Sequence, residues 1–145
     1  MKTRIILLVP VIMLIIGTRG YAQDKVYKDG TVWEVSFIKV NSNMSDDYLK
    51  SLKTSWKAVS DEAVKQGLIL SYKVLEGSAS NPSDFDIMLM TEFRNLASME
   101  GQDDKWQAIE KKVLGSEENM KKLNESRVSI RTIFGQKLLR EIVYQ

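Results

Sequence analysis

The chain has 145 residues with 21 basic and 19 acidic side chains, and its formal net charge is +2. It contains neither cysteine nor histidine, which excludes disulfide bonds, cysteine nucleophiles, Ser-His-Asp triads, His-ligated haem and most zinc sites. Chemistry would have to come from carboxylate, Lys, Tyr, Arg or hydroxyl side chains, or from a borrowed cofactor. No EF-hand pattern is present, and we expect neither a metal nor a cofactor.

Residues 1–22 have the three-part pattern of a secretory signal peptide. Lys2 and Arg4 precede an apolar run over residues 5–16, and Gly20-Tyr21-Ala22 places small residues at a cleavage site. The run is short for a membrane span, which needs ~20 apolar residues, and an uncleaved anchor is the alternative. Cleavage after Ala22 predicts a periplasmic or secreted protein with no stable membrane insertion.

Cleavage would also change the charge balance. It removes Lys2, Arg4 and Arg19 and leaves 123 residues with 18 basic and 19 acidic side chains. That length suits one domain with a hydrophobic core. The net charge becomes −1 and no basic tract of five or more residues remains, so no nucleic-acid partner is expected.

The first predicted elements are a strand and a helix. Residues 31–40 are rich in β-branched and aromatic types and predict the strand. Residues 47–66 predict the helix, with Ser45 or Asp46 as its N-cap and Gly67 as its C-terminal stop. Apolar residues recur along this helix at spacings of three and four, which marks one buried face: Leu49, Leu52, Trp56, Val59 and Ala63.

The second half of the chain predicts a hairpin, two helices and a last strand. Residues 68–76 and 84–95 are the hairpin strands, joined by the turn-rich loop 77–84. The remaining predicted elements are a helical turn that bends near Gly101 and continues as a helix to Gly115, a short polar helix over 116–126 with Ser116 as its cap, and a long strand over 128–144 with Gly135 as a bulge. The buried face of the longer helix carries Trp106, Ile109 and Val113.

The resulting order is β-α-β-β-α-β, with a small extra helix before the last strand. This is the ferredoxin-like order. It predicts an α+β fold in which an antiparallel four-stranded sheet carries its helices on one face. A polar lead-in over residues 23–30 and a single domain over residues 31–145 would make up the mature chain.

The strand over residues 84–95 has two unequal faces, because successive side chains alternate across a sheet. The apolar face should meet the helices; it carries Phe85, Ile87, Leu89, Thr91 and Phe93, with Leu70, Tyr72 and Val74 from the neighbouring strand. The other face carries Asp86, Met88, Met90 and Glu92, with Ser71 and Lys73 beside them. That face is too apolar for a fully solvated one, so we expect a partner to cover it. The alternative is a monomer with a mixed, solvated face.

Three segments make the chain similar to the dimeric α+β barrel superfamily, which includes antibiotic-biosynthesis monooxygenases and stress-responsive barrel proteins. They are "WEVSFIKV" (33–40), "AVKQG" (63–67) and "TEFRNLASME" (91–100). The resemblance covers residues 31–144 and implies that two sheets pack open face to open face, with the last strand reaching toward the partner. The protein would then be a homodimer with Met88 and Met90 in the interface, where methionine adapts well to irregular gaps.

The same resemblance implies a pocket inside each subunit, between sheet and helices. Its lining residues would be Glu34, Ser36, Tyr72, Thr91 and Phe93 from the strands, with Trp56 and Trp106 from the helices. Glu34 could act as a general acid or base and Tyr72 could donate a hydrogen bond, which makes these two the candidate catalytic residues. Phe93 and Trp106 could stack on a flat ligand. The plainer alternatives are an exposed Glu34, tryptophans that belong to the core, and an ordinary half-buried Tyr72.

Three functions fit these observations. The first is an exported homodimer that binds a small, flat hydrophobic molecule between sheet and helices, without established catalysis. The second is a cofactor-independent, monooxygenase-like enzyme; haem-degrading members and barrel-type polyketide cyclases of the superfamily use a histidine, which this chain lacks. The third is a structural or interaction dimer with a filled core. A cavity above ~300 Å³ that contains Glu34 would separate the first two from the third.

Overall fold

The computed structural model describes residues 25–145. The predicted signal peptide and its cleavage site lie outside these residues. Within the described part of the chain, no helix combines the length and the apolar character that a membrane crossing requires.

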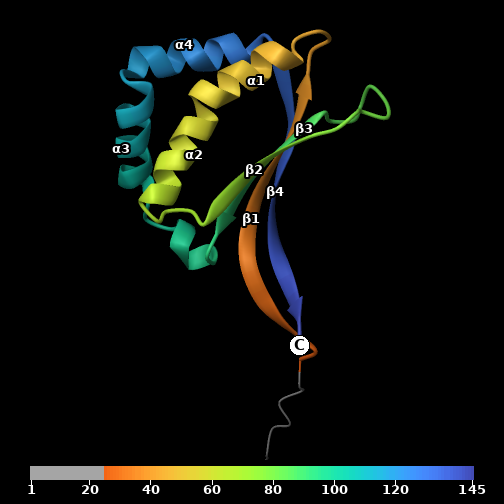
Figure 1. Ribbon diagram of the computed structural model, residues 1–145, viewed down its shortest axis with the longest axis vertical. Coiled ribbons are helices and arrows are strands. Elements are labelled where there is room, and N and C mark those ends of the chain that lie inside the picture. The colour runs from red at the N-terminus through yellow and green to blue at the C-terminus, as the bar shows by residue number, and fades with distance from the viewer. Residues whose placement is uncertain (1–24) are drawn as a thin grey trace, which may run out of the picture.

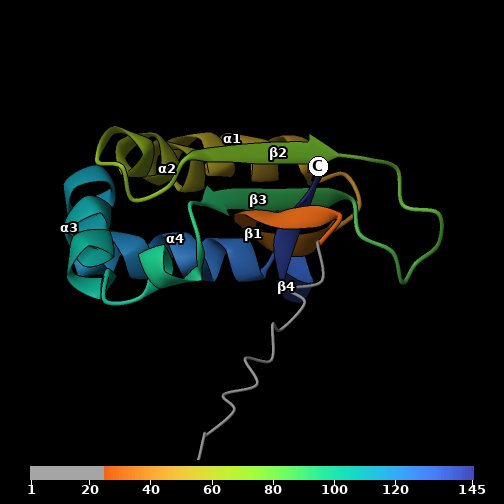
Figure 2. The same cartoon turned by 90° about the horizontal axis from the view of Figure 1, so that it is seen from below.

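A four-stranded antiparallel sheet in the order β2-β3-β1-β4 forms one layer of the domain (Figure 1). The strands are Tyr27–Val40 (β1), Ser71–Glu76 (β2), Ile87–Phe93 (β3) and Arg131–Tyr144 (β4). Figure 2 shows them stacked in this order, with the loop between β2 and β3 projecting away from the helices. This arrangement confirms the predicted ferredoxin-like α+β fold.

The helices form the second layer and gather on one side of the sheet (Figure 1). They are Ser45–Thr54 (α1), Trp56–Lys65 (α2), the 3₁₀ turn Leu96–Met99 (η1), Asp103–Leu114 (α3) and Glu117–Val128 (α4). The positive φ of Gly101 (64°) and of Gly115 (85°) confirms the predicted bend and stop around α3. Ser116 caps α4 as predicted, because its hydroxyl accepts a hydrogen bond from the Asn119 amide at 3.3 Å.

The helix predicted over residues 47–66 is divided at Ser55, whose backbone leaves the helical region (φ −129°, ψ −90°). Ser55 is buried, and its hydroxyl donates to the carbonyl oxygen of Ser51, one turn earlier. Hydrogen bonds of this kind compete with the helical ladder and bend helices. The periodicity of the apolar residues continues through the break, so it could not reveal the break.

The predicted start of this helical segment is wrong, whereas its predicted end is confirmed. The prediction of Ser45 or Asp46 as a side-chain cap is wrong, because α1 begins at Ser45 and Met44 precedes it without a side-chain cap. The prediction for Gly67 is confirmed: its φ is +70°, and the amide of Leu68 donates to the Ala63 carbonyl at 3.0 Å.

The two long strands, β1 and β4, form a ribbon that runs well beyond the helices (Figure 1). β1 starts at Tyr27, opposite Tyr144, so residues 27–30 of the expected lead-in are part of a strand. Phe37 faces Gly135 whereas Ile38 faces Ile133, which leaves one extra residue in β4 and confirms the bulge at Gly135.

The uncovered side of the sheet is called the open face from here on. It carries Trp33, Phe37, Leu75, Met88, Met90, Phe134 and Leu139, with Lys73 and Lys137. The register confirms the predicted neighbours, since Lys73 lies opposite Met90 and Ser71 opposite Glu92.

The prediction that Phe85 lies on the helix-facing side of the sheet is wrong. Its ring lies 4.9 Å from the ring of Phe37, on the open face. β3 begins only at Ile87, so strict alternation does not extend back to Phe85. Asp86 instead turns its carboxylate onto the amide of Val40, at 2.9 Å, and interrupts the regular pattern.

Two apolar clusters form the core under the helices. The first contains Val32, Ala63, Leu68, Ile69, Phe93 and Ile109, with Val59, Tyr72, Met99, Trp106 and Val113 packed against it. The second contains Ile38, Val40, Tyr48, Leu52, Ile87 and Leu89, with Met44, Leu49, Trp56 and Ile130 packed against it. Leu70 and Val74, predicted for the core, are exposed at 41% and 37% because they lie at the β2 edge of the sheet.

Candidate functional site: a cavity between sheet and helices

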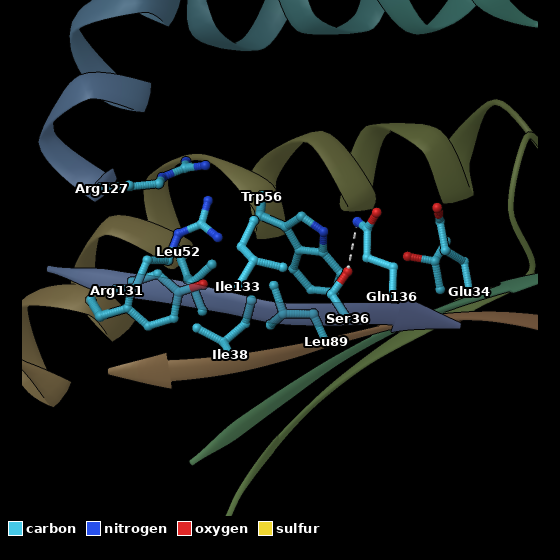
Figure 3. Close-up of a pocket in the computed structure, with 12 residues that line it drawn as sticks. Glu34, Ser36, Ile38, Leu52, Trp56, Leu89, Arg127, Arg131, Ile133 and Gln136 are labelled. Atoms are coloured by element: carbon cyan, nitrogen blue, oxygen red, sulfur yellow. Dashed lines mark hydrogen bonds between the residues drawn. The ribbon is translucent and has the colours of Figure 1, made fainter. Parts of the chain in front are cut away.

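A cavity of about 190 Å³ lies between the sheet and the helices (Figure 3). Strands β1, β3 and β4 form one wall, and α1, α2 and the end of α4 form the other. The lining residues are Glu34, Ser36, Ile38, Tyr48, Leu52, Trp56, Leu89, Thr91, Arg127, Arg131, Ile133 and Gln136. Figure 3 shows arginines at one end, apolar side chains in the middle, and Gln136 with Glu34 at the other end.

The polar end contains three of the predicted site residues. Glu34, Ser36 and Thr91 line the cavity, with Glu34 opposite Thr91 in the strand register. The Gln136 side chain donates to the Ser36 hydroxyl at 3.1 Å. Glu34 itself is exposed, as the plainer alternative expected, so it lies at the mouth of the cavity and not in an apolar interior.

Three other predicted site residues lie outside this cavity. Phe93 is buried in the first apolar cluster, and Trp106 packs against the same cluster. The Tyr72 hydroxyl donates to the carboxylate of Asp61 on α2, and its ring packs edge-on against Trp56 at 5.4 Å between centroids. Burial first, and then the Asp61 hydrogen bond, raises the pKa of Tyr72.

Trp56 is the one predicted tryptophan that does line the cavity. With Leu52, Leu89 and Ile133 it forms the apolar middle section. Ile133 is 50% exposed, so the cavity opens toward the edge strand β4.

The cationic end was not predicted from the sequence. It consists of Arg127 from α4, Arg131 from the start of β4, and Tyr48 from α1. The guanidinium carbon of Arg131 lies 5.6 Å from the centre of the Tyr48 ring. Tyr48 lies one helical turn before Leu52, and this spacing could have placed Tyr48 on the buried face of the helix. Nothing local in the sequence places Arg127 and Arg131 next to Tyr48.

The ionisation of this end follows from burial. Burial first, and then the like charge of Arg131, lowers the pKa of Arg127, which still stays protonated at neutral pH. Burial raises the pKa of Tyr48, an effect that the two arginines partly oppose. Tyr48 is therefore a neutral hydroxyl, able to donate a hydrogen bond, near two cations.

A larger hollow of about 740 Å³ lies beside the turn between α3 and α4. Most of its wall is exposed polar side chain, including Gln107, Lys111, Glu117 and Glu118. It holds no buried polar group that needs a ligand, so the smaller cavity is the better candidate site. Within residues 25–145, no three acidic side chains gather in a way that could hold a metal ion.

The open face is a second candidate surface. Met88 and Met90 lie on it, half-buried, as predicted. The ammonium groups of Lys73 and Lys137 lie over the rings of Trp33 and Phe37, at 5.0 Å and 5.9 Å from the ring centres. The edge strand β4 adds Phe134 and Leu139 to this face, at 43% and 46% exposed, whereas its exposed Ile133 and Leu138 lie opposite Ile38 and Glu34 on the helix side.

Comparison with known proteins assigns the chain to no family. No protein-family model and no curated protein matches the chain. Among solved structures, the chain is similar to HapK from Hahella chejuensis, with 10% identity and a TM-score of 0.45 over 76% of this chain and 91% of that one. It is also similar to a dimeric ferredoxin-like protein from an uncultured marine organism, with 17% identity and a TM-score of 0.47 over 80% and 90%.

Proposed function

We propose that the protein binds a small, flat hydrophobic molecule in the cavity between sheet and helices, and that it does so as an exported homodimer. The observation that carries the proposal is the cavity itself, which combines an apolar middle with polar groups at both ends. This is the usual composition of a small-molecule site.

The size of the cavity restricts the ligand. The cavity contains Glu34, but its volume of about 190 Å³ is below the ~300 Å³ that the sequence-based criterion required, so that criterion excludes a drug-sized ligand. A closed apolar cavity of about 150 Å³ is nevertheless enough to hold benzene in another protein. A ligand with one ring and a short substituent therefore fits, whereas a polycyclic molecule would have to extend past Ile133 into solvent.

The same geometry supports binding more than catalysis. Glu34 lies exposed at the cavity mouth, and the Tyr72 hydroxyl is engaged with Asp61 outside the cavity. A general acid or base has to reach the reacting atom within hydrogen-bond distance, which Tyr72 does not do from this position.

A second copy of the chain is the proposed cover for the open face. β4 is an edge strand of 14 residues whose outer backbone groups have no strand partner within residues 25–145. Long apolar edges invite pairing, and a two-fold axis would bring two copies of β4 together antiparallel. Met88 and Met90 would lie against the partner's open face if the joined sheets also curve so that their open faces pack together, as the proposed barrel requires.

Export is proposed from the sequence pattern of residues 1–22 alone. The expected outcome is a mature protein that begins at Gln23, and intact-mass measurement of the exported fraction tests it. An exported protein that still begins at Met1 would overturn cleavage after Ala22 and favour the uncleaved anchor.

Fluorescence titration tests the binding proposal directly, because Trp56 lines the cavity. Single-ring aromatic and quinone-like compounds should change its emission saturably, and the signal should disappear in Trp56→Phe but persist in Trp33→Phe on the open face. Glu34→Gln should weaken binding with the fold intact, whereas Glu100→Gln, which changes another exposed carboxylate, should not. If no compound gives a saturable signal, the function as a structural or interaction dimer with a filled core replaces this proposal. If Glu34→Gln leaves the binding affinity unchanged, Glu34 is not part of the site, but the rest of the proposal stands.

A further inference from the structure

We infer that the Arg127–Arg131–Tyr48 end of the cavity is an oxyanion site, so that the ligand is a small aromatic acid with a carboxylate or phosphate head. The inference rests on the proposed function and names the chemical class of its ligand. The apolar body would lie against Trp56, and the acidic head would lie between the two guanidinium groups.

The first observation is that neither arginine has an acidic partner. In the described part of the chain, no carboxylate forms an ion pair with Arg127 or Arg131. The Nε of Arg127 donates to the Ser51 hydroxyl at 3.3 Å, which is a neutral partner. Partly buried arginines are normally paired, because a desolvated cation without a counter-charge is unfavourable.

The second observation is independent of charge. The Tyr48 side chain is fully buried at 0% exposure, and its hydroxyl has no hydrogen-bond partner among residues 25–145. The Nε of Arg131 is likewise buried without a partner. Most buried polar groups in proteins are satisfied, so two unsatisfied donors at one end of the cavity point to an acceptor that binds there.

The third observation is the arrangement of the whole cavity. Figure 3 shows the guanidinium groups of Arg127 and Arg131 next to each other, with Glu34 at the opposite end. An oxyanion between the arginines would offset their mutual repulsion and accept from planar donor groups that match carboxylate and phosphate geometry. A neutral ligand with an acceptor oxygen would satisfy the unpaired donors but would leave the repulsion between the two arginines uncompensated.

Calorimetric titration of the intact protein with benzoate, phenyl phosphate and benzamide tests the inference. The three probes share one ring and differ in the head group. Benzoate or phenyl phosphate should bind about tenfold or more tightly than benzamide, because charge-assisted hydrogen bonds are stronger than neutral ones. Whichever of benzoate and phenyl phosphate binds with the higher affinity identifies the preferred head group.

Arg131→Gln and Arg127→Gln should each remove most of this preference, and higher ionic strength should weaken it. Arg94→Gln, which removes the same charge from an exposed loop, is the control and should leave the preference unchanged. If Arg131→Gln does not fold, the Arg127→Gln variant and the dependence of binding on ionic strength still test the inference.

The outcomes separate the two proposals. Benzamide that binds as well as benzoate, with no effect of either arginine, overturns the oxyanion site and leaves the proposed function standing. No binding of any of the three probes also overturns the oxyanion site, and the proposed function then depends on the wider fluorescence titration alone.

Discussion

Tyr48→Phe should stabilise the ligand-free protein, although most substitutions of buried residues destabilise. The change removes one oxygen from a side chain that is 0% exposed and whose hydroxyl has no partner within residues 25–145. A phenylalanine ring keeps the apolar contacts with Leu52 and Ile38 in the second cluster, and it keeps a ring under Arg131.

The expected magnitude follows from the desolvation of the hydroxyl. A buried polar group without a hydrogen bond costs about 1–3 kcal/mol, so its removal should raise the free energy of unfolding by a similar amount. For a domain of this size, each kcal/mol corresponds to roughly 4 °C in Tm. Urea unfolding followed by circular dichroism and calorimetric Tm both measure the change.

Tyr72→Phe is the matched control, because the Tyr72 hydroxyl donates to Asp61. Removal of that oxygen should lower the free energy of unfolding by about 1 kcal/mol, in the opposite direction. If Tyr48→Phe destabilises as much as Tyr72→Phe, the Tyr48 hydroxyl has a partner such as an ordered water. The argument for a ligand at that hydroxyl would then fail.

Further predictions concern the interface, alkaline pH and the core. Met88→Glu with Met90→Glu should give monomers or aggregates, because like charges would be buried against each other in the proposed dimer; a double variant that dimerises like the parent protein in light scattering would exclude this face. Because the pKa of Tyr48 is raised in the folded state, its contribution to the free energy of unfolding should be fully present below pH 10.0, the ordinary pKa of tyrosine. That contribution should be lost as the pH rises through the raised pKa of Tyr48. In urea unfolding, the free energy of unfolding of Tyr48→Phe should therefore decline less steeply at alkaline pH than that of the parent protein. An identical decline in both proteins would show that Tyr48 does not cause it. Ile109→Ala, at 0% exposure, should cost about 2–5 kcal/mol in urea unfolding, whereas exposed Val128→Ala should cost little.

The fold was predictable because its signals are local and periodic. Alternation in β3, the positive-φ glycine at residue 67 and the bulge glycine at residue 135 each specify backbone geometry from a few neighbouring residues. The misplaced features depend on tertiary contacts. Ser55 breaks a helix whose apolar period is uninterrupted, and Phe85 changes face because Asp86 bonds to β1.

Apart from Trp56 on α2, the site was predictable only where it lies on strands next to each other in the sheet. Glu34, Ser36 and Thr91 share one face by alternation and pairing, and all three line the cavity. Arg127 and Arg131 come from the end of α4 and the start of β4. Their approach to α1 depends on how α4 crosses the sheet, which no local pattern in the sequence encodes.

The division of the core into two clusters explains why a cavity exists at all. Ser36 and Thr91 lie between the apolar residues of the two clusters on the helix-facing side of the sheet, Val32 and Phe93 on one side, Ile38 on the other. Aliphatic side chains at Ser36 and Thr91 would join the clusters into one core and fill the space under Trp56, which would stabilise the fold. A sequence that keeps hydroxyl groups there, and unpaired arginines at the far end of the same space, forgoes that stability in this cavity. Such local departures from good packing are typical of functional sites, which is the physical reason to look for a ligand in this cavity before any other.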